Sequence, residues 1–305
     1  MTYEILPPTT EGRVPFSDGE TWYRITGDLA SGVTPLVTAH GGPGATHQYL
    51  LSLTAIADPD GPARPVIHYD QIGCGNSTHL PDADPSYWNV DLFLAELDNL
   101  LDHLGIADSY HLLGQSWGGM LGSEHAVRRP AGLKRLVISN SPASMPLWLE
   151  AAAALRAELP ADVDETLRKH EEAGTTDSPE YHAAMKVFYD RHVCRVVPNP
   201  PEVAAAFAAM DENPTVYHTM NGPSEFHVVG SMKDWSVIDR LPHIAVPTLV
   251  ISGQYDEAQP VCVSPYADLI PGARWETFAE SSHLPNVEEP DRYLAVVESF
   301  LRGEA

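Results

Sequence analysis

The sequence has few cysteines and few positive charges, and it contains no long hydrophobic run. Its three cysteines, Cys74, Cys194 and Cys262, are far apart, which excludes a disulfide framework and a zinc-binding pattern. Only 18 lysines and arginines stand against 42 acidic residues, a net charge of −24. This charge argues against nucleic acid and against anionic membrane surfaces as partners. No apolar run approaches the roughly 20 residues that a membrane helix needs.

The first residues also lack the features of a targeting segment. Residues 1–8 have no basic region followed by an apolar core, so we expect no secretory signal. With cysteines that form no disulfide pattern, this predicts a cytoplasmic protein. A hydrophobic content of 43% with 20% charged residues is typical of a globular chain with a sizeable core. The length of 305 residues allows one large domain with an insertion, or two domains.

Short apolar runs bounded by glycine and proline predict a buried sheet. Segments 13–19 and 21–26 alternate polar and apolar residues, which is typical of antiparallel edge strands. Unbroken apolar runs follow at 35–39, 65–69, 110–113, 136–139, 247–252 and 274–278. Strands buried on both faces, with helices between them, indicate a parallel sheet. The clearest helices are predicted at 91–105, from its leucine spacing, and at about 291–301.

A glycine-flanked serine is the strongest indication of chemistry. Residues 114–119 read G-Q-S-W-G-G and contain the pattern G-x-S-x-G. They lie between a predicted strand and a predicted helix, 120–127. A serine at such a turn is typical of the nucleophile elbow of an α/β-hydrolase. The turn strains the serine backbone, and side chains at Gly114 and Gly118 would collide with the neighbouring helix and strand.

A helical insertion is expected within this core. From about residue 141 to residue 235 the strand signal disappears, and helices are predicted at 151–157, 165–170, 181–187 and 203–210. An insertion at this place forms a cap over the active site in hydrolases of this fold. We therefore expect an α/β-hydrolase fold with a mostly parallel central sheet. Its core is predicted over residues 1–141 and 236–305, and its helical cap over residues 142–235.

A serine nucleophile needs a base, and the base needs an acid that orients it. In α/β-hydrolases these residues follow the chain order serine, acid, histidine. The acid is expected just after a late strand, where Asp256 and Glu257 are adjacent carboxylates. The base is expected after the last strand, where His283 precedes the final helix. These agreeing placements predict Ser116 as the nucleophile and His283 as the base.

An oxyanion hole completes such a site. It needs one backbone N–H from the residue after the nucleophile and a second from the loop after an early strand. Trp117 follows Ser116 and supplies the first. The glycine-rich segment 40–44, directly after the predicted strand 35–39, is expected to supply the second.

Three segments together resemble the proline iminopeptidase family of serine peptidases, and the resemblance covers most of the chain. The segments are H-G-G-P-G at 40–44, D-Q-I-G-C-G-N-S at 70–77 and G-Q-S-W-G-G at 114–119. The resemblance implies Ser116 as nucleophile, Asp256 as the acid, His283 as base, and the backbone N–H groups of Gly42 and Trp117 as the oxyanion hole. It implies neither a metal nor another cofactor.

A fourth segment, M-N-G-P-S-E-F at 220–226, resembles the branch of the family that includes the tricorn-interacting aminopeptidase. In that branch a cap glutamate and the glutamate after the triad aspartate hold the free amino terminus of the substrate. The resemblance implies these roles for Glu225 and Glu257. An α-ammonium group, with a pKa near 7.7, is largely charged at neutral pH. A carboxylate about 4 Å away contributes roughly 4 kcal/mol before desolvation.

Four other residues invite a functional interpretation, but structural roles are favoured. Asp70 is expected to accept hydrogen bonds within its loop, and Cys74 to be a small buried side chain. Tyr217 and Trp235 are expected to pack the cap.

The residues favour a metal-independent aminopeptidase that releases a small N-terminal residue, such as proline, from short peptides through an acyl-enzyme. The alternative is an L-amino-acid amidase, or an arylamide or ester hydrolase, which uses the same residues and differs in the leaving group. A non-catalytic binding module with this fold is disfavoured by the intact set Ser116, Asp256 and His283. The partner is thus a small-molecule substrate, whereas the side-chain preference, physiological substrate and oligomeric state are left open.

Overall fold

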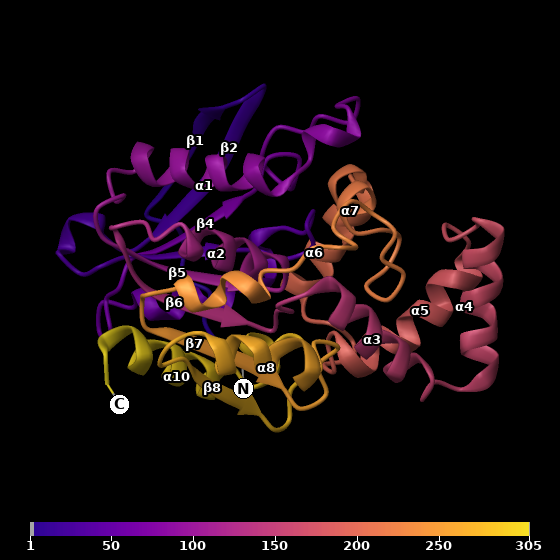
Figure 1. The fold of residues 1–305 in the computed structure, drawn as a ribbon. Helices are drawn as coiled ribbons and strands as arrows, with labels where there is room; N and C mark the ends of the chain where they lie inside the picture. The colour runs from indigo at the N-terminus through magenta and orange to yellow at the C-terminus, as the bar shows by residue number, and fades with distance from the viewer. Residues whose placement is uncertain (1–2, 305) are drawn as a thin grey trace.

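The centre of the molecule is an eight-stranded sheet, seen in a computed structural model that describes residues 3–304 (Figure 1). The strands are β1 (Thr10–Phe16), β2 (Gly19–Thr26), β3 (Leu36–Ala39), β4 (Val66–Asp70), β5 (Tyr110–Gln115), β6 (Leu133–Ser139), β7 (Thr248–Gly253) and β8 (Arg274–Phe278). Their order across the sheet is β1-β2-β4-β3-β5-β6-β7-β8. The pairs β1–β2 and β2–β4 are antiparallel and all others are parallel, which confirms the predicted fold class.

Strands β3, β4, β5 and β7 are buried along their whole length because helices cover both faces of the sheet. The helices are α1 (Val90–His103), α2 (Trp117–Val127), α3 (Met145–Arg156), α4 (Ala161–Ala173), α5 (Pro179–His192), α6 (Pro201–Glu212), α7 (Thr215–Met220), α8 (Pro260–Leu269), α9 (Pro285–Glu288) and α10 (Pro290–Arg302). Successive strand residues point to opposite faces. Val37 and Leu112 therefore join one core cluster with α1, α2 and α8. Their neighbours Leu36 and Leu113 join another, with α10 and the 3₁₀ helix η2 (His47–Ala57).

The structure shifts several predicted boundaries and adds elements. β8 has the predicted bounds, whereas β6 begins at Leu133 rather than at residue 136. Sequence patterns missed α7, which is too short to show a period, and α8, whose apolar pattern is interrupted by Pro265. Within residues 3–304, none of the helices combines the length and the apolar character needed to cross a membrane.

The helical insertion lies between β6 and β7 and consists of α3 to α7. Three of the predicted helices fall within α4, α5 and α6, and the first, 151–157, overlaps α3 but ends one residue beyond it. Residues of α3, α4 and α5, among them Leu155, Leu167 and Phe188, form a small core of their own. Figure 1 shows α4 and α5 standing away from the sheet, beyond α3. α6 instead packs on η2 through Val203 and Ala206. The division at residues 142–235 into a cap domain stays a prediction.

Candidate active site

Ser116 lies at a sharp turn between β5 and α2. Its φ of 55° is positive, which strains a residue that carries a side chain. The turn is possible because of the flanking glycines. A Cβ atom at Gly114 would lie 1.9 Å from the Gly118 carbonyl oxygen, and one at Gly118 would lie 2.0 Å from the Ala39 oxygen. The predicted collisions are confirmed, and the elbow directs Ser116 into a cavity that His283 also lines.

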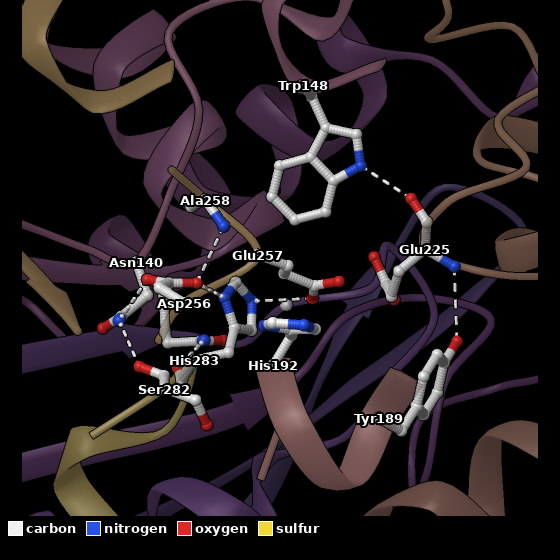
Figure 2. Close-up of polar contacts among 12 residues, drawn as sticks. Asn140, Trp148, Tyr189, His192, Glu225, Asp256, Glu257, Ala258, Ser282 and His283 are labelled. Atoms are coloured by element: carbon white, nitrogen blue, oxygen red, sulfur yellow. Dashed lines mark hydrogen bonds and ion pairs between the residues drawn. The ribbon is translucent and has the colours of Figure 1, made fainter. Parts of the chain in front are cut away.

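His283 faces Asp256 from the loop that follows β8 (Figure 2). Its Nδ1 lies 2.7 Å from Asp256 Oδ1. Because an ionised carboxylate only accepts hydrogen bonds, Nδ1 carries the hydrogen and Nε2 is free to accept a proton. Burial by itself lowers the pKa of His283, but the attraction and hydrogen bond to Asp256 outweigh it and raise the pKa above its usual value. This orientation suits a general base.

His283 and Ser116 line the same cavity but are not hydrogen-bonded to each other. Within residues 3–304, no hydrogen bond joins Ser116 Oγ to His283 Nε2. Nε2 instead lies 3.8 Å from Glu257 Oε1, as the dashed line in Figure 2 marks. Catalytic hydrogen bonds are often long until a substrate is bound. The cavity thus brings Ser116, His283 and Glu257 together without a hydrogen bond between the serine and the histidine.

Asn140 holds Asp256 in place, a role that no local sequence pattern indicated. Its Nδ2 donates to Asp256 Oδ2 at 2.6 Å and to the Ser282 carbonyl oxygen at 3.2 Å. The backbone N–H of Ala258 donates to Asp256 Oδ1 at 2.8 Å. Asp256 is fully buried, so these bonds replace the water that its carboxylate has lost. Asn140 therefore ties the acid to the loop that carries His283.

The two segments expected to form the oxyanion hole meet beside Ser116. Gly42 and Trp117 line a common small cavity with the serine. The side chain of Gln71 joins these segments, because its Nε2 donates to the His40 carbonyl oxygen at 3.1 Å and its Oε1 accepts from Trp117 Nε1 at 2.8 Å. Gln71 belongs to the segment 70–77 used for the family resemblance, but no role was predicted for it.

A second chain of hydrogen bonds links the glycine-rich loop to the loop of the base. The Gly41 N–H donates to the Tyr49 hydroxyl at 2.6 Å, and this hydroxyl donates to Gln115 Oε1 at 2.6 Å. Gln115 Nε2 then donates to the His283 carbonyl oxygen at 3.0 Å. The residue just before Ser116 thus joins the two loops on either side of it.

Glu225 and Glu257 come from different parts of the chain and line the same cavity as Ser116 and His283. Glu225 follows α7, and its Oε1 accepts a 2.7 Å hydrogen bond from the Tyr217 hydroxyl. Its backbone is held as well, because the carbonyl oxygen accepts from Trp148 Nε1 at 2.6 Å (Figure 2). Glu257 is only 2% exposed, and neither of its carboxyl oxygens has a hydrogen-bond partner within residues 3–304.

Burial disfavours the charged form of both glutamates. Burial raises the pKa of Glu257 well above its usual value, and the charges of Glu225 and Asp256 raise it further. Burial also raises the pKa of Glu225, although the Tyr217 hydrogen bond and the charge of His283 oppose this. Burying an unpartnered carboxylate is costly. The pair is therefore suited to a positively charged group, whose entry would offset this cost.

Replacing Glu257 by glutamine is expected to stabilise the protein at alkaline pH. The pKa of Glu257 is raised in the folded protein, so the folded state holds this proton to a higher pH than the unfolded state does. Its contribution to the free energy of unfolding is therefore highest at low pH, where Glu257 is protonated in both states, and it falls as the pH rises. Glutamine resembles the protonated acid and does not titrate. We expect Glu257→Gln to match the wild type near pH 4. At pH 8 it should melt at least about 2 °C higher, which corresponds to a gain of about 1 kcal/mol in the free energy of unfolding.

Melting curves of both proteins at several pH values check this expectation. Glu150→Gln, at an exposed position of α3, is the matched control and should melt like the wild type throughout. A difference that does not depend on pH, or a less stable Glu257→Gln at pH 8, would show that ionising the buried carboxyl group does not destabilise the folded protein.

The residues expected to be structural mostly are so. Asp70 accepts hydrogen bonds from His47 and Asn76, as predicted, and Cys74 is buried. Trp235 donates to Glu124. The expectation for Tyr217 was incomplete, because its hydroxyl orients Glu225 in addition to packing the insertion. In the described part of the chain, no three His, Cys, Asp or Glu side chains are grouped to hold a metal ion.

Comparison with known proteins gives close matches over nearly the whole chain. Residues 34–290 match a family model described as the alpha/beta hydrolase fold. A proline iminopeptidase of Heyndrickxia coagulans is 37% identical over 96% of this chain and 99% of its own length. The crystal structure of VinJ superposes with a TM-score of 0.95 at 56% identity, over 98% and 100% of the two chains. That of a proline iminopeptidase from Mycobacterium smegmatis has a TM-score of 0.88 at 53% identity, over 96% and 98%.

Proposed function

The chain belongs to the α/β-hydrolase fold family and, within it, to the proline iminopeptidases, and from this membership we propose that it is a serine aminopeptidase. It cleaves the amide bond after a free N-terminal residue, such as proline. One observation carries the proposal. The buried carboxyl group of Glu257, which has no hydrogen-bond partner among the residues that the structure describes, lies beside Glu225 in the cavity that Ser116 and His283 line. A free ammonium group on the substrate would supply the positive charge that these two carboxyl groups lack.

Substrate binding is the first step of the proposed mechanism. Glu225 and Glu257 hold the α-ammonium group, with Tyr217 and Trp148 keeping Glu225 in position. Hydrogen bonds to charged partners are about twice as strong as neutral ones, so a blocked amine binds poorly. Because the amine is anchored within this cavity, the carbonyl group of the first residue is the one presented to Ser116.

Acylation follows. His283 Nε2 takes the Ser116 hydroxyl proton as Oγ bonds to the carbonyl carbon, and Asp256 stabilises the imidazolium that forms. The backbone N–H groups of Gly42 and Trp117 stabilise the negative oxygen. His283 then gives its proton to the amide nitrogen, the C–N bond breaks, and the amine product leaves.

Deacylation repeats these roles with water. His283 removes a proton from water, which bonds to the acyl carbon and displaces Ser116 Oγ. Oγ takes the proton back, and the free amino acid is released. This chemistry requires no metal and no other cofactor.

A panel of substrates tests the proposal against its alternatives. Pro-Gly, prolinamide and an N-acyl anilide share an amide but differ in the free amine and in the leaving group. We expect turnover of substrates with a free amine only. If prolinamide reacts and Pro-Gly does not, the enzyme is an amino-acid amidase. If only the N-blocked anilide reacts, the aminopeptidase proposal fails. A serine-directed fluorophosphonate that labels neither the wild type nor Ser116→Ala would favour a non-catalytic module.

The hydrolysis of an uncharged ester should weaken as the pH falls, because only the neutral imidazole of His283 accepts a proton. Its pKa is raised, so kcat/KM for nitrophenyl acetate should reach half of its plateau above pH 6.5. An ester is used because it has no ammonium group whose own titration would enter the profile. A rate that stays constant down to pH 4 would contradict the role of His283.

We also propose that the helical insertion acts as a cap over the active site. Glu225, Phe207 and Met210 all come from this insertion and line the cavity at Ser116, which supports the division of the chain into a core (1–141 and 236–305) and a cap (142–235). The substrate is expected to be a short peptide or an amino-acid amide. A cytoplasmic location stays a prediction.

A further inference from the structure

A second, larger cavity adjoins the one at Ser116. The first has a volume of about 50 Å³, enough for one small residue, and the second about 540 Å³. The larger cavity lies among α5, α6 and α7 of the insertion. Val193, Phe207 and Met210 line both cavities and therefore stand between them, and these three apolar side chains are called the neck below. The function proposed above assigns no part of a substrate to this space.

Charge, size and the route of the proton indicate which part of the substrate each cavity binds. The ammonium group belongs with Glu225 and Glu257 in the first cavity. A third cavity, of about 20 Å³, adjoins Ser116 and has an apolar lining that includes Met145 and Trp148. Its size suits a small side chain. The leaving group must receive its proton from His283, which lines the first cavity and, among the described residues, not the third. The leaving group therefore departs through the first cavity, toward the neck.

We propose that the second cavity is the binding site of the leaving group, and that it selects amides of extended, apolar amines that carry no carboxylate. This rests on the function proposed above, since it assigns the remaining part of the same substrate. The walls are largely apolar, with Met185, Phe207, Met210 and Pro214 among them. Burial of each further methylene group is favourable, so a chain that passes the neck binds more tightly as it lengthens.

The charges around the second cavity disfavour a carboxylate at the end of the leaving group. Asp177, Asp190 and Asp211 line it, and Lys186 is paired with Asp190 at 2.6 Å. Burial lowers the pKa of His218, so its ring is neutral at pH 7. A carboxylate at the end of the leaving group would meet acidic side chains without a free lysine or arginine to pair with, among the residues described. An alkyl chain meets no such penalty.

The second cavity also contacts the residues that hold the ammonium site. Tyr189 and Tyr217 line it, while the Tyr217 hydroxyl donates to Glu225 Oε1 at 2.7 Å and the Glu225 N–H donates to the Tyr189 hydroxyl at 3.2 Å. A leaving group in the cavity packs on these two tyrosines. Its binding therefore supports the carboxylate that anchors the other end of the substrate.

A series of prolyl amides tests the inference: prolinamide, the butylamide, the hexylamide, and the amide of 6-aminohexanoate, which matches the hexylamide but ends in a carboxylate. We expect kcat/KM to rise at least tenfold from prolinamide to the hexylamide. The 6-aminohexanoate compound should be at least tenfold poorer than the hexylamide. Equal values along the series would overturn the inference. If no prolyl compound reacts at all, the proposed aminopeptidase function fails instead.

Two variants connect the effect to this cavity. Met185→Trp fills it from α5, and should reduce the hexylamide-to-prolinamide ratio of kcat/KM to near one. Ala183→Trp adds the same bulk at an exposed position of the same helix and should leave both rates unchanged. If Met185→Trp keeps the wild-type ratio, the leaving group does not bind here.

Asp211→Lys, at an exposed position of α6, provides a second readout that does not depend on packing. It places a cation beside the cavity, and should raise the rate of the 6-aminohexanoate compound relative to the hexylamide at least threefold. An unchanged ratio would mean that the acidic lining does not select the leaving group.

Discussion

Asp256→Asn is expected to lower kcat about 10⁴-fold, the loss known for this change in serine proteases of another fold. Both carboxylate oxygens of Asp256 accept hydrogen bonds, from His283 and Ala258 on one side and from Asn140 on the other. An asparagine side chain has a single acceptor oxygen. If its amide nitrogen faces His283, Nδ1 must accept and the hydrogen moves to Nε2, which then cannot take the serine proton. In the other orientation the amide meets the Asn140 donor, and the imidazolium still lacks its counter-charge.

The measurement is steady-state hydrolysis of prolinamide, with melting curves to show that the variant is folded. Asp239→Asn, which makes the same change at an exposed position, is the control and should keep the wild-type rate. The loss should appear in kcat and leave KM nearly unchanged, because Asp256 lies behind His283 and does not line the cavity that receives the substrate. A folded variant within tenfold of the wild type would remove Asp256 from the mechanism.

Glu225→Gln should lower kcat/KM about 100-fold for substrates with a free amine. This corresponds to about 2–3 kcal/mol, the upper range for a hydrogen bond to a charged group. Glutamine retains an oxygen that can accept from the Tyr217 hydroxyl, so the surrounding structure is preserved while the negative charge is removed. An uncharged ester, which does not use this charge, should lose less than threefold.

Prolinamide and nitrophenyl acetate, measured with the same enzyme preparations, separate the two possible roles of Glu225. Equal losses on both substrates would mean that Glu225 only supports the insertion, through Trp148 and Tyr217. Glu150→Gln, on the exposed face of α3, controls for the change of net charge and should behave like the wild type on both substrates.

The locally encoded parts of the fold and site could be predicted from the sequence. The strand, glycine-flanked serine and helix around Ser116 are consecutive in the chain, and steric conflict at Gly114 and Gly118 explains the pattern without any knowledge of the rest. The apolar runs also predicted the parallel strands, because a strand covered on both faces has no polar side to show. Boundaries were less well predicted where the first residues of a strand are partly exposed, as in β6.

Residues that act across the sheet could not be predicted in this way. Asn140 directly follows β6, and its role arises because β6 pairs with β7, whose following loop carries Asp256. Gln71 follows β4, next to β3, which leads into the glycine-rich loop. In both cases, neighbouring parallel strands end at the same edge of the sheet and bring their loops together. The order of the strands decides these contacts, and strand order leaves little trace in a local pattern.

The sequence by itself determined the fold class, the serine elbow and the order of the proposed catalytic residues, since these depend on short segments and on which residues can be buried. Only the tertiary structure decided the charge and the volume of the cavities around Ser116. It places Glu225 beside Glu257, leaves the buried carboxyl group of Glu257 without a hydrogen-bond partner among the described residues, and sets a larger cavity behind Val193, Phe207 and Met210. These features depend on how the insertion packs on the sheet. The charge and volume that a substrate meets arise from segments far apart in the chain.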